Sequence, residues 1–94
     1  MEPNTIVIQI PAKGAKYVNV GIVLNDDIAV FELNFFTNAH NWGVVLINPD
    51  GESVVKTVRL GTDIFGIEST YEDAVYTFDV CHNQATDMYE VIFR

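Results

Sequence analysis

The sequence predicts one all-β domain over residues 1–94, built as a small antiparallel β-sandwich or barrel of about seven strands. Apolar residues recur at every second position along most of the chain, whereas no segment shows the 3.6-residue apolar stripe of an amphipathic helix. Short runs of Gly, Pro, Asn and Asp separate the alternating segments, as turns do between strands. A length of 94 residues also suits a single domain.

Three strands are expected in the first third of the chain. The first ends at Pro11, and the second and third are joined by a turn at Asn25-Asp26-Asp27. Successive side chains of a strand point to opposite faces, so each strand is expected to turn one apolar face to the core. These faces are Ile6, Ile8 and Ile10; Val18, Val20, Ile22 and Leu24; and Ala29, Phe31, Leu33 and Phe35.

A β-hairpin is expected in the middle of the chain. Its first strand, Trp42 to Ile47, is apolar on both faces except at Gly43. Asn48-Pro49-Asp50-Gly51 is the strongest turn signal, because Pro presets φ and Asp-Gly accepts the left-handed conformation that follows. Residues 52–60 form the return strand, and Lys56 interrupts its apolar face. We therefore expect the return strand to be near a sheet edge or only partly buried.

Two further strands are expected in the last third, at residues 74–80 and 88–93. Residues 61–66 are predicted to be a turn-rich connection bracketed by glycines. The pattern of residues 67–73 is ambiguous and is compatible with a single helical turn. Residues 81–87 are predicted to form a polar loop.

The charge balance argues against nucleic-acid binding. Thirteen acidic residues face five basic ones, for a net charge of -8, and the basic residues are scattered along the chain. A nucleic-acid binder needs clustered cations to displace phosphate counterions. We also expect no membrane segment and no signal peptide, because no apolar run is long enough. The single cysteine excludes an intrachain disulfide and favours synthesis in a reducing compartment.

A thiol–imidazole pair is the first catalytic candidate. Cys81 and His82 are adjacent, and adjacent side chains of an extended backbone point apart, so His82 is poorly placed to activate the thiol. The alternative is a partly buried Cys at a strand end and a solvated His. His40 lies in a separate Asn-rich turn.

Metal and carboxylate chemistry also lacks a pattern. One Cys and two distant His do not make a zinc site, and the turns at residues 25–27 and 48–52 do not match the spacing of an EF-hand. Asp63 and the pair Glu72-Asp73 are the carboxylates to consider for glycoside hydrolysis, but nothing places them opposite each other. We therefore expect no enzyme, no metal and no cofactor.

The apolar content suggests contact with other chains. Hydrophobic residues make up 49% of the sequence, including six Phe, four Tyr and one Trp, which exceeds the needs of a lone sandwich. Trp42 and the neighbouring Phe35-Phe36 are thus core or interface residues. The alternative is a carbohydrate- or peptide-binding module, in which Trp42 stacks on the ligand and Asn38, Asn41 and Asp50 supply hydrogen bonds.

Several segments follow one another in a recognisable order: a short Ile-Pro strand, a long hairpin, an aromatic-initiated strand, an Asp-Gly turn and a Leu-Gly-x-Asp-Leu/Ile segment. In this sequence the corresponding stretches are Ile8-Gln9-Ile10-Pro11, Tyr17 to Phe36, Trp42 to Asn48, Asp50-Gly51-Glu52, and Val58 to Phe65. This order resembles the cyanophage-type baseplate plug family of contractile phage tails. The sequence departs from the pattern at Asn48, where the family has acidic residues, and between Gly66 and the final strand.

The resemblance implies a structural role in the virion, in the tail baseplate, with synthesis in the cytoplasm of the bacterial host. The implied partners are hub, tube and spike proteins in a hetero-oligomeric assembly, met partly through strand addition at exposed sheet edges. An acidic surface would suit a lumen through which DNA slides without sticking. The expected interface residues are Phe36, Trp42, Val44, Val45, Ile47, Ile64 and Phe65.

Overall fold

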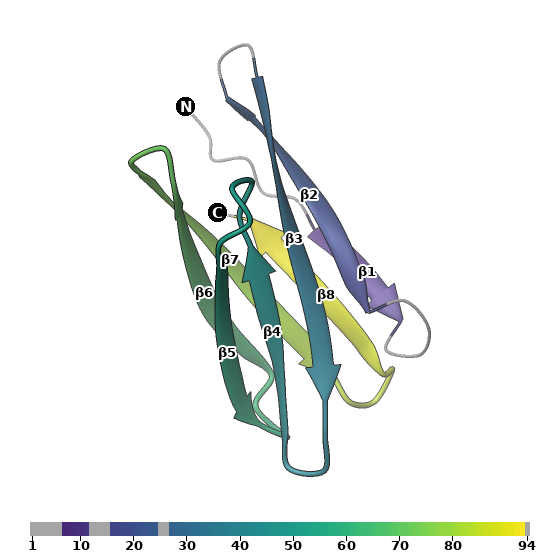
Figure 1. Ribbon diagram of the computed structural model, residues 1–94. Coiled ribbons are helices and arrows are strands. Elements are labelled where there is room, and N and C mark those ends of the chain that lie inside the picture. Colours follow the sequence, from purple (N-terminus) through teal and green to yellow (C-terminus); the bar gives the residue numbers. More distant parts are fainter. Residues whose placement is uncertain (1–6, 12–15, 25–26, 94) are drawn as a thin grey trace.

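The computed structural model describes residues 7–11, 16–24 and 27–93, which form two four-stranded antiparallel sheets packed face to face (Figure 1). The predicted β-sandwich is confirmed, and the two sheets do not close into a barrel. Ile6 and the Asn25-Asp26 part of a predicted turn lie outside the described residues. The strands are β1 (Val7–Pro11), β2 (Tyr17–Leu24), β3 (Asp27–Thr37), β4 (Asn41–Ile47), β5 (Ser53–Arg59), β6 (Ile64–Tyr71), β7 (Ala74–Asn83) and β8 (Met88–Phe93).

Each sheet is assembled mainly from strands that follow one another in the chain. Sheet I has the order β2-β3-β4-β5, and sheet II has the order β1-β8-β7-β6. The chain passes from sheet I to sheet II between β5 and β6, which are the edge strands on the same side of the sandwich (Figure 1). The β4–β5 and β6–β7 hairpins lie at one end of the molecule, and the β3–β4 and β7–β8 turns lie at the other.

Strand β6 was not predicted. The expected connection is confirmed for residues 61–63 but not for residues 64–66, which begin β6. The ambiguous stretch 67–73 contains no helical turn, because residues 64–71 pair with β7 from Ile64↔Cys81 to Tyr71↔Ala74. Its inner face includes Ser69, a buried polar residue, so the apolar alternation of this strand is interrupted in the sequence. Strand β7 also runs on to Asn83, so the predicted loop at residues 81–87 is shorter than expected.

The core lies between the sheets and follows the predicted alternation. The expected inward faces of β3, β7 and β8 are buried, and so are Val20 and Ile22 of β2. Aromatic rings make up much of this core, and each buried large side chain contributes about 1.5–3 kcal/mol. Phe31 packs on Tyr76 and Phe78, with ring centroids 5.0 and 5.5 Å apart.

Polar contacts also connect the two sheets. The Thr37 and Tyr89 hydroxyls bond each other across the sandwich, and the Trp42 indole nitrogen donates over 2.8 Å to the carbonyl oxygen of Thr62, in the connection that leads from β5 to β6. Lys56 donates from Nζ to the Gly66 carbonyl oxygen over 2.8 Å, which ties the edge strands β5 and β6 together. Most of β5 is exposed on both faces, as the position of Lys56 in the sequence predicted for an edge strand.

Candidate functional site

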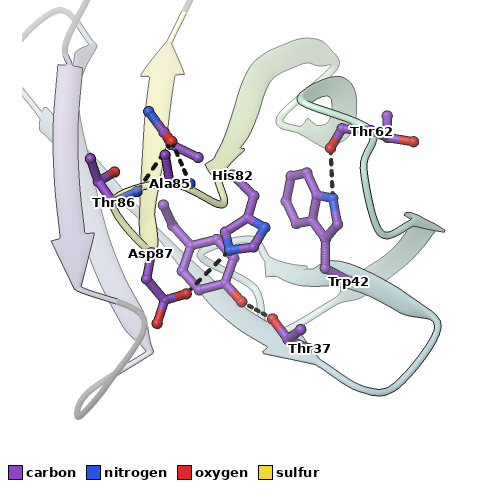
Figure 2. A network of polar contacts seen from close by, with 9 residues as sticks. Thr37, Trp42, Thr62, His82, Ala85, Thr86 and Asp87 are labelled. Carbon is purple, nitrogen blue, oxygen red and sulfur yellow. Dashed lines mark hydrogen bonds and ion pairs between the residues drawn. The ribbon is translucent and has the colours of Figure 1, made fainter.

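A hollow of about 770 Å³ opens on the outer face of sheet II, beside the β7–β8 turn. The Asn83 carboxamide oxygen shapes this turn by accepting hydrogen bonds from the backbone amides of Ala85 and Thr86 (Figure 2). The lining residues are Asp63, Ile64, Cys81, His82, Asn83, Gln84, Ala85, Thr86, Met88 and Glu90. The hollow is therefore lined by the one thiol of the chain and by two carboxylates, those of Asp63 and Glu90.

The thiol of Cys81 is not prepared for nucleophilic chemistry. Burial raises the pKa of this thiol, and the carboxylates of Glu90, Asp79 and Asp63 raise it further. A raised pKa lowers the fraction of thiolate, which is the reactive form. The environment is therefore the opposite of the electropositive surroundings that activate catalytic cysteines.

The ring of His82 lies on the other side of the strand, inside the sandwich. It is 6% exposed, stacks on Tyr89 with centroids 4.8 Å apart, and lies 5.5 Å from the Trp42 ring (Figure 2). Its Nε2 is 3.5 Å from Oδ1 of Asp87. The expectation of a solvated His82 is wrong, because β7 continues past it and places its side chain on the inner face.

The remaining chemical candidates do not converge. His40 is exposed in the β3–β4 turn, and Asp63 and the pair Glu72-Asp73 lie beyond opposite ends of β6. Within the described ranges, no group of three or more His, Cys, Asp or Glu side chains is arranged to hold a metal ion. The part of the chain that the structure describes contains no helix long and apolar enough to cross a membrane.

Trp42 cannot stack on a ligand in this structure. Its side chain is 0% exposed, its ring packs on Phe65 with centroids 4.9 Å apart, and its indole N–H is bonded to Thr62. The hypothesis of a Trp42 binding platform is therefore wrong.

The structure divides the expected interface residues among three places. Trp42, Val44 and Phe65 belong to the core, so a partner cannot reach their side chains. Phe36, Val45 and Ile47 are half-buried on the outer face of sheet I, and Ile64 is exposed at the rim of the hollow in sheet II. Only the residues of these last two places can contact a partner directly.

The outer face of sheet I also carries apolar residues that the sequence analysis did not single out. They are Tyr17, Val23, Ile28, Val30 and Val55, all exposed. The register aligns Val23 with Ile28 and Val45 with Val55, so apolar side chains are neighbours on this face. Their signal in the sequence was present, since Val23 and Val30 occupy the outward positions of strands whose inward positions are also apolar.

Comparisons with known proteins found no similar protein. No protein-family model matches the sequence, and neither the curated proteins nor the solved structures contain a significant match.

Proposed function

We propose that this protein is a non-enzymatic structural component that works through protein–protein contacts, in the baseplate of a contractile phage tail. The single observation that carries the first part is the apolar outer face of sheet I, with exposed Val, Ile and Tyr side chains on a sheet that nothing in the described chain covers. Exposed apolar surface of this kind is typical of interaction sites.

Two further observations support a role without turnover. The hollow on sheet II holds a thiol whose pKa is raised, and the neighbouring histidine is enclosed in the core. The edge strands β2 and β5 flank the apolar face, and edge strands are sites where strands of neighbouring proteins can be added.

The baseplate setting is supported by the order of the segments that resemble the plug family, from the Ile-Pro strand to the Leu-Gly-Thr-Asp-Ile segment. Such a protein would act by geometry and buried area, in contact with hub, tube and spike proteins.

The test is assembly with purified hub, tube and spike proteins of the same tail, measured by size-exclusion chromatography with light scattering. We expect a stable complex with at least one of them. A chain that remains monomeric at high concentration and binds none of the three would overturn the proposal. A complex found only with unrelated proteins would overturn the baseplate setting but keep the interaction role.

A further inference from the structure

Strand β2 is an edge of sheet I, and among the described strands it pairs only with β3 (Figure 1). The Lys16 carbonyl oxygen accepts a 2.6 Å hydrogen bond from the Phe35 amide, which fixes the alternation of the β2–β3 ladder. In an antiparallel ladder, residues that bond the neighbouring strand alternate with residues whose backbone N–H and C=O groups point away from it. Every second residue of β2 therefore turns its backbone groups to the free edge. These residues are Tyr17, Asn19, Gly21 and Val23, and all of them are exposed.

The edge at β2 lacks the features that protect the other edges. Among the four edge strands that the structure describes, β2 alone contains neither a charged residue nor a proline. Strand β1 ends at Pro11, β5 contains Lys56 and Arg59, and β6 contains Glu68. Charges and prolines are the usual means by which an edge strand avoids pairing with another chain. The β2 edge is thus the one suited to strand addition.

Opposite charges flank β2 in the sequence. Lys13 and Lys16 precede the strand, and Asp26 and Asp27 follow it. Antiparallel pairing of two copies of β2 would place the basic end of each strand beside the acidic end of the other, whereas parallel pairing would bring like charges together. The edge is therefore complementary in charge to an antiparallel copy of itself.

We propose that a second copy of this chain pairs antiparallel with β2 about a two-fold axis, so that the two copies of sheet I form one continuous sheet. The register places Tyr17 opposite Val23 of the second copy and Asn19 opposite its Gly21, because this register uses every residue of β2 whose backbone groups face the edge. Each such pair exchanges two backbone hydrogen bonds. The inference goes beyond the proposed function and does not depend on it, since the pairing needs only this chain.

The same register brings Lys16 close to Asp27 of the second copy. Lys16 lies opposite Leu24 of the second copy, and Leu24 pairs with Asp27 within its own chain. The Cα atoms of Lys16 and Asp27 are then two strand spacings apart, about 10 Å, which the two side chains can span. Within one chain these residues lie at opposite ends of β2, about 25 Å apart, so they can meet only between copies.

The net charge of each copy opposes association but does not prevent it. Each chain carries a net charge of -8, which produces a general repulsion between copies. At physiological ionic strength, charges farther apart than about 8 Å are largely screened. Contacts along the shared edge are shorter than this distance, so the backbone hydrogen bonds and the Lys16–Asp27 contacts outweigh the repulsion.

The first test compares proline substitutions on two edges of sheet I. Asn19→Pro removes an N–H that faces the free edge of β2. Thr57→Pro is the matched control on β5, where the 2.9 Å bond from the Leu60 amide to the His40 carbonyl oxygen shows that the Thr57 backbone faces away from β4. Proline is tolerated where the N–H makes no bond within its own sheet.

Sedimentation equilibrium from about 1 µM to 1 mM measures the dimer directly. We expect wild-type protein to form a dimer in this range. Asn19→Pro should weaken the dimer by about tenfold or more, and Thr57→Pro should leave it nearly unchanged.

The second test exchanges the charges at the two ends of β2. Lys16→Glu and Asp27→Lys should each weaken the dimer by about three- to tenfold, because each contact occurs twice in a two-fold dimer. The double variant Lys16→Glu with Asp27→Lys restores opposite charges and should recover the wild-type affinity to within about threefold. The control, Lys16→Glu with Asp63→Lys, has the same net charge and should show no recovery.

The outcomes are distinct for the two proposals. Wild-type protein that stays monomeric overturns this inference, and if it still binds a hub, tube or spike protein the proposed function stands. A dimer that survives Asn19→Pro, or that Thr57→Pro abolishes, also overturns the inference. Absence of recovery in the charge exchange overturns the antiparallel register. Thermal melts show that each variant is folded, and the proline comparison decides by itself if Asp27→Lys unfolds through loss of the 2.9 Å bond from the Ile28 amide to Oδ1 of Asp27.

Discussion

The Asn48 side-chain nitrogen donates a hydrogen bond of 2.9 Å to the backbone carbonyl of Thr70, which joins the β4–β5 turn of sheet I to β6 of sheet II. The same nitrogen donates to Oε1 of Glu52 over 3.0 Å, and the side-chain oxygen Oδ1 of Asn48 accepts hydrogen bonds from the backbone amides of Asp50 and Glu52. Asn48 is buried, so these bonds satisfy polar atoms that water cannot reach.

Asn48→Ala should lower the free energy of unfolding by about 2–4 kcal/mol, because it leaves several backbone and side-chain groups without partners. Urea denaturation of both proteins measures the difference. Asn38→Ala is the matched control: its Oδ1 accepts from the amides of His40 and Asn41, but in an exposed turn within one sheet. Equal losses for the two variants would contradict a special role for the contact between the sheets.

Gly43→Ala should be strongly destabilising. A Cβ on Gly43 would lie 2.4 Å from the Lys56 carbonyl oxygen and 2.8 Å from the ring of Phe36, its cross-strand partner. Overpacking of this kind costs about 1–3 kcal/mol, and here part of the clash is with backbone. Gly66→Ala provides the comparison, since the nearest atom to its Cβ would be Oδ1 of Asp79 at 3.4 Å. Thermal melts should show a clear drop in Tm for Gly43→Ala alone.

The β6–β7 turn should tolerate a stabilising substitution. Glu72 and Asp73 have φ values of 49° and 65°, in the left-handed region that hairpin turns fill more easily with Asn-Gly. Glu72→Asn with Asp73→Gly should raise stability by about 1–2 kcal/mol. Glu68→Asn, an exposed position on extended β6, should give no gain. A double variant that melts at or below the wild-type temperature would show that the turn is not strained.

Cys81 should react slowly with alkylating reagents. Its pKa is raised by burial and then by Glu90, Asp79 and Asp63, so the thiolate appears at higher pH than in a short peptide. The rate of reaction with iodoacetamide, followed from pH 7 to 10, gives the midpoint. Glu90→Gln should move that midpoint to lower pH, because it removes the neighbouring charge that raises the pKa of the thiol most. A wild-type midpoint at or below that of the peptide would disprove the described environment.

The alternation of side chains could be read from the sequence because it is a local property of the pleated backbone. Tyr76, Phe78 and Val80 were expected to point inward, and all three are buried. The Asn-Pro-Asp-Gly turn after Ile47 and the edge position of Lys56 were predicted on equally local grounds, and both are confirmed.

Features that depend on distant strands could not be read in the same way. Strand β6 exists through its pairing with β7, and its buried Ser69 does not look apolar in the sequence. The burial of His82 similarly requires β7 to extend and Trp42 and Tyr89 to meet its ring from other strands. The local pattern of the sequence therefore predicts neither strand β6 nor the burial of His82.

The sequence by itself determined an all-β chain, the inward faces of most strands and the main turns. Only the tertiary structure decided which of two apolar faces is covered. Val44 and Val45 are adjacent valines of β4, yet Val44 is 0% exposed while Val45 lies on the outer face of sheet I. The reason is physical: alternation assigns side chains to two faces, but burial depends on which face the other sheet packs against. That packing left the face of Val23, Ile28 and Val30 exposed.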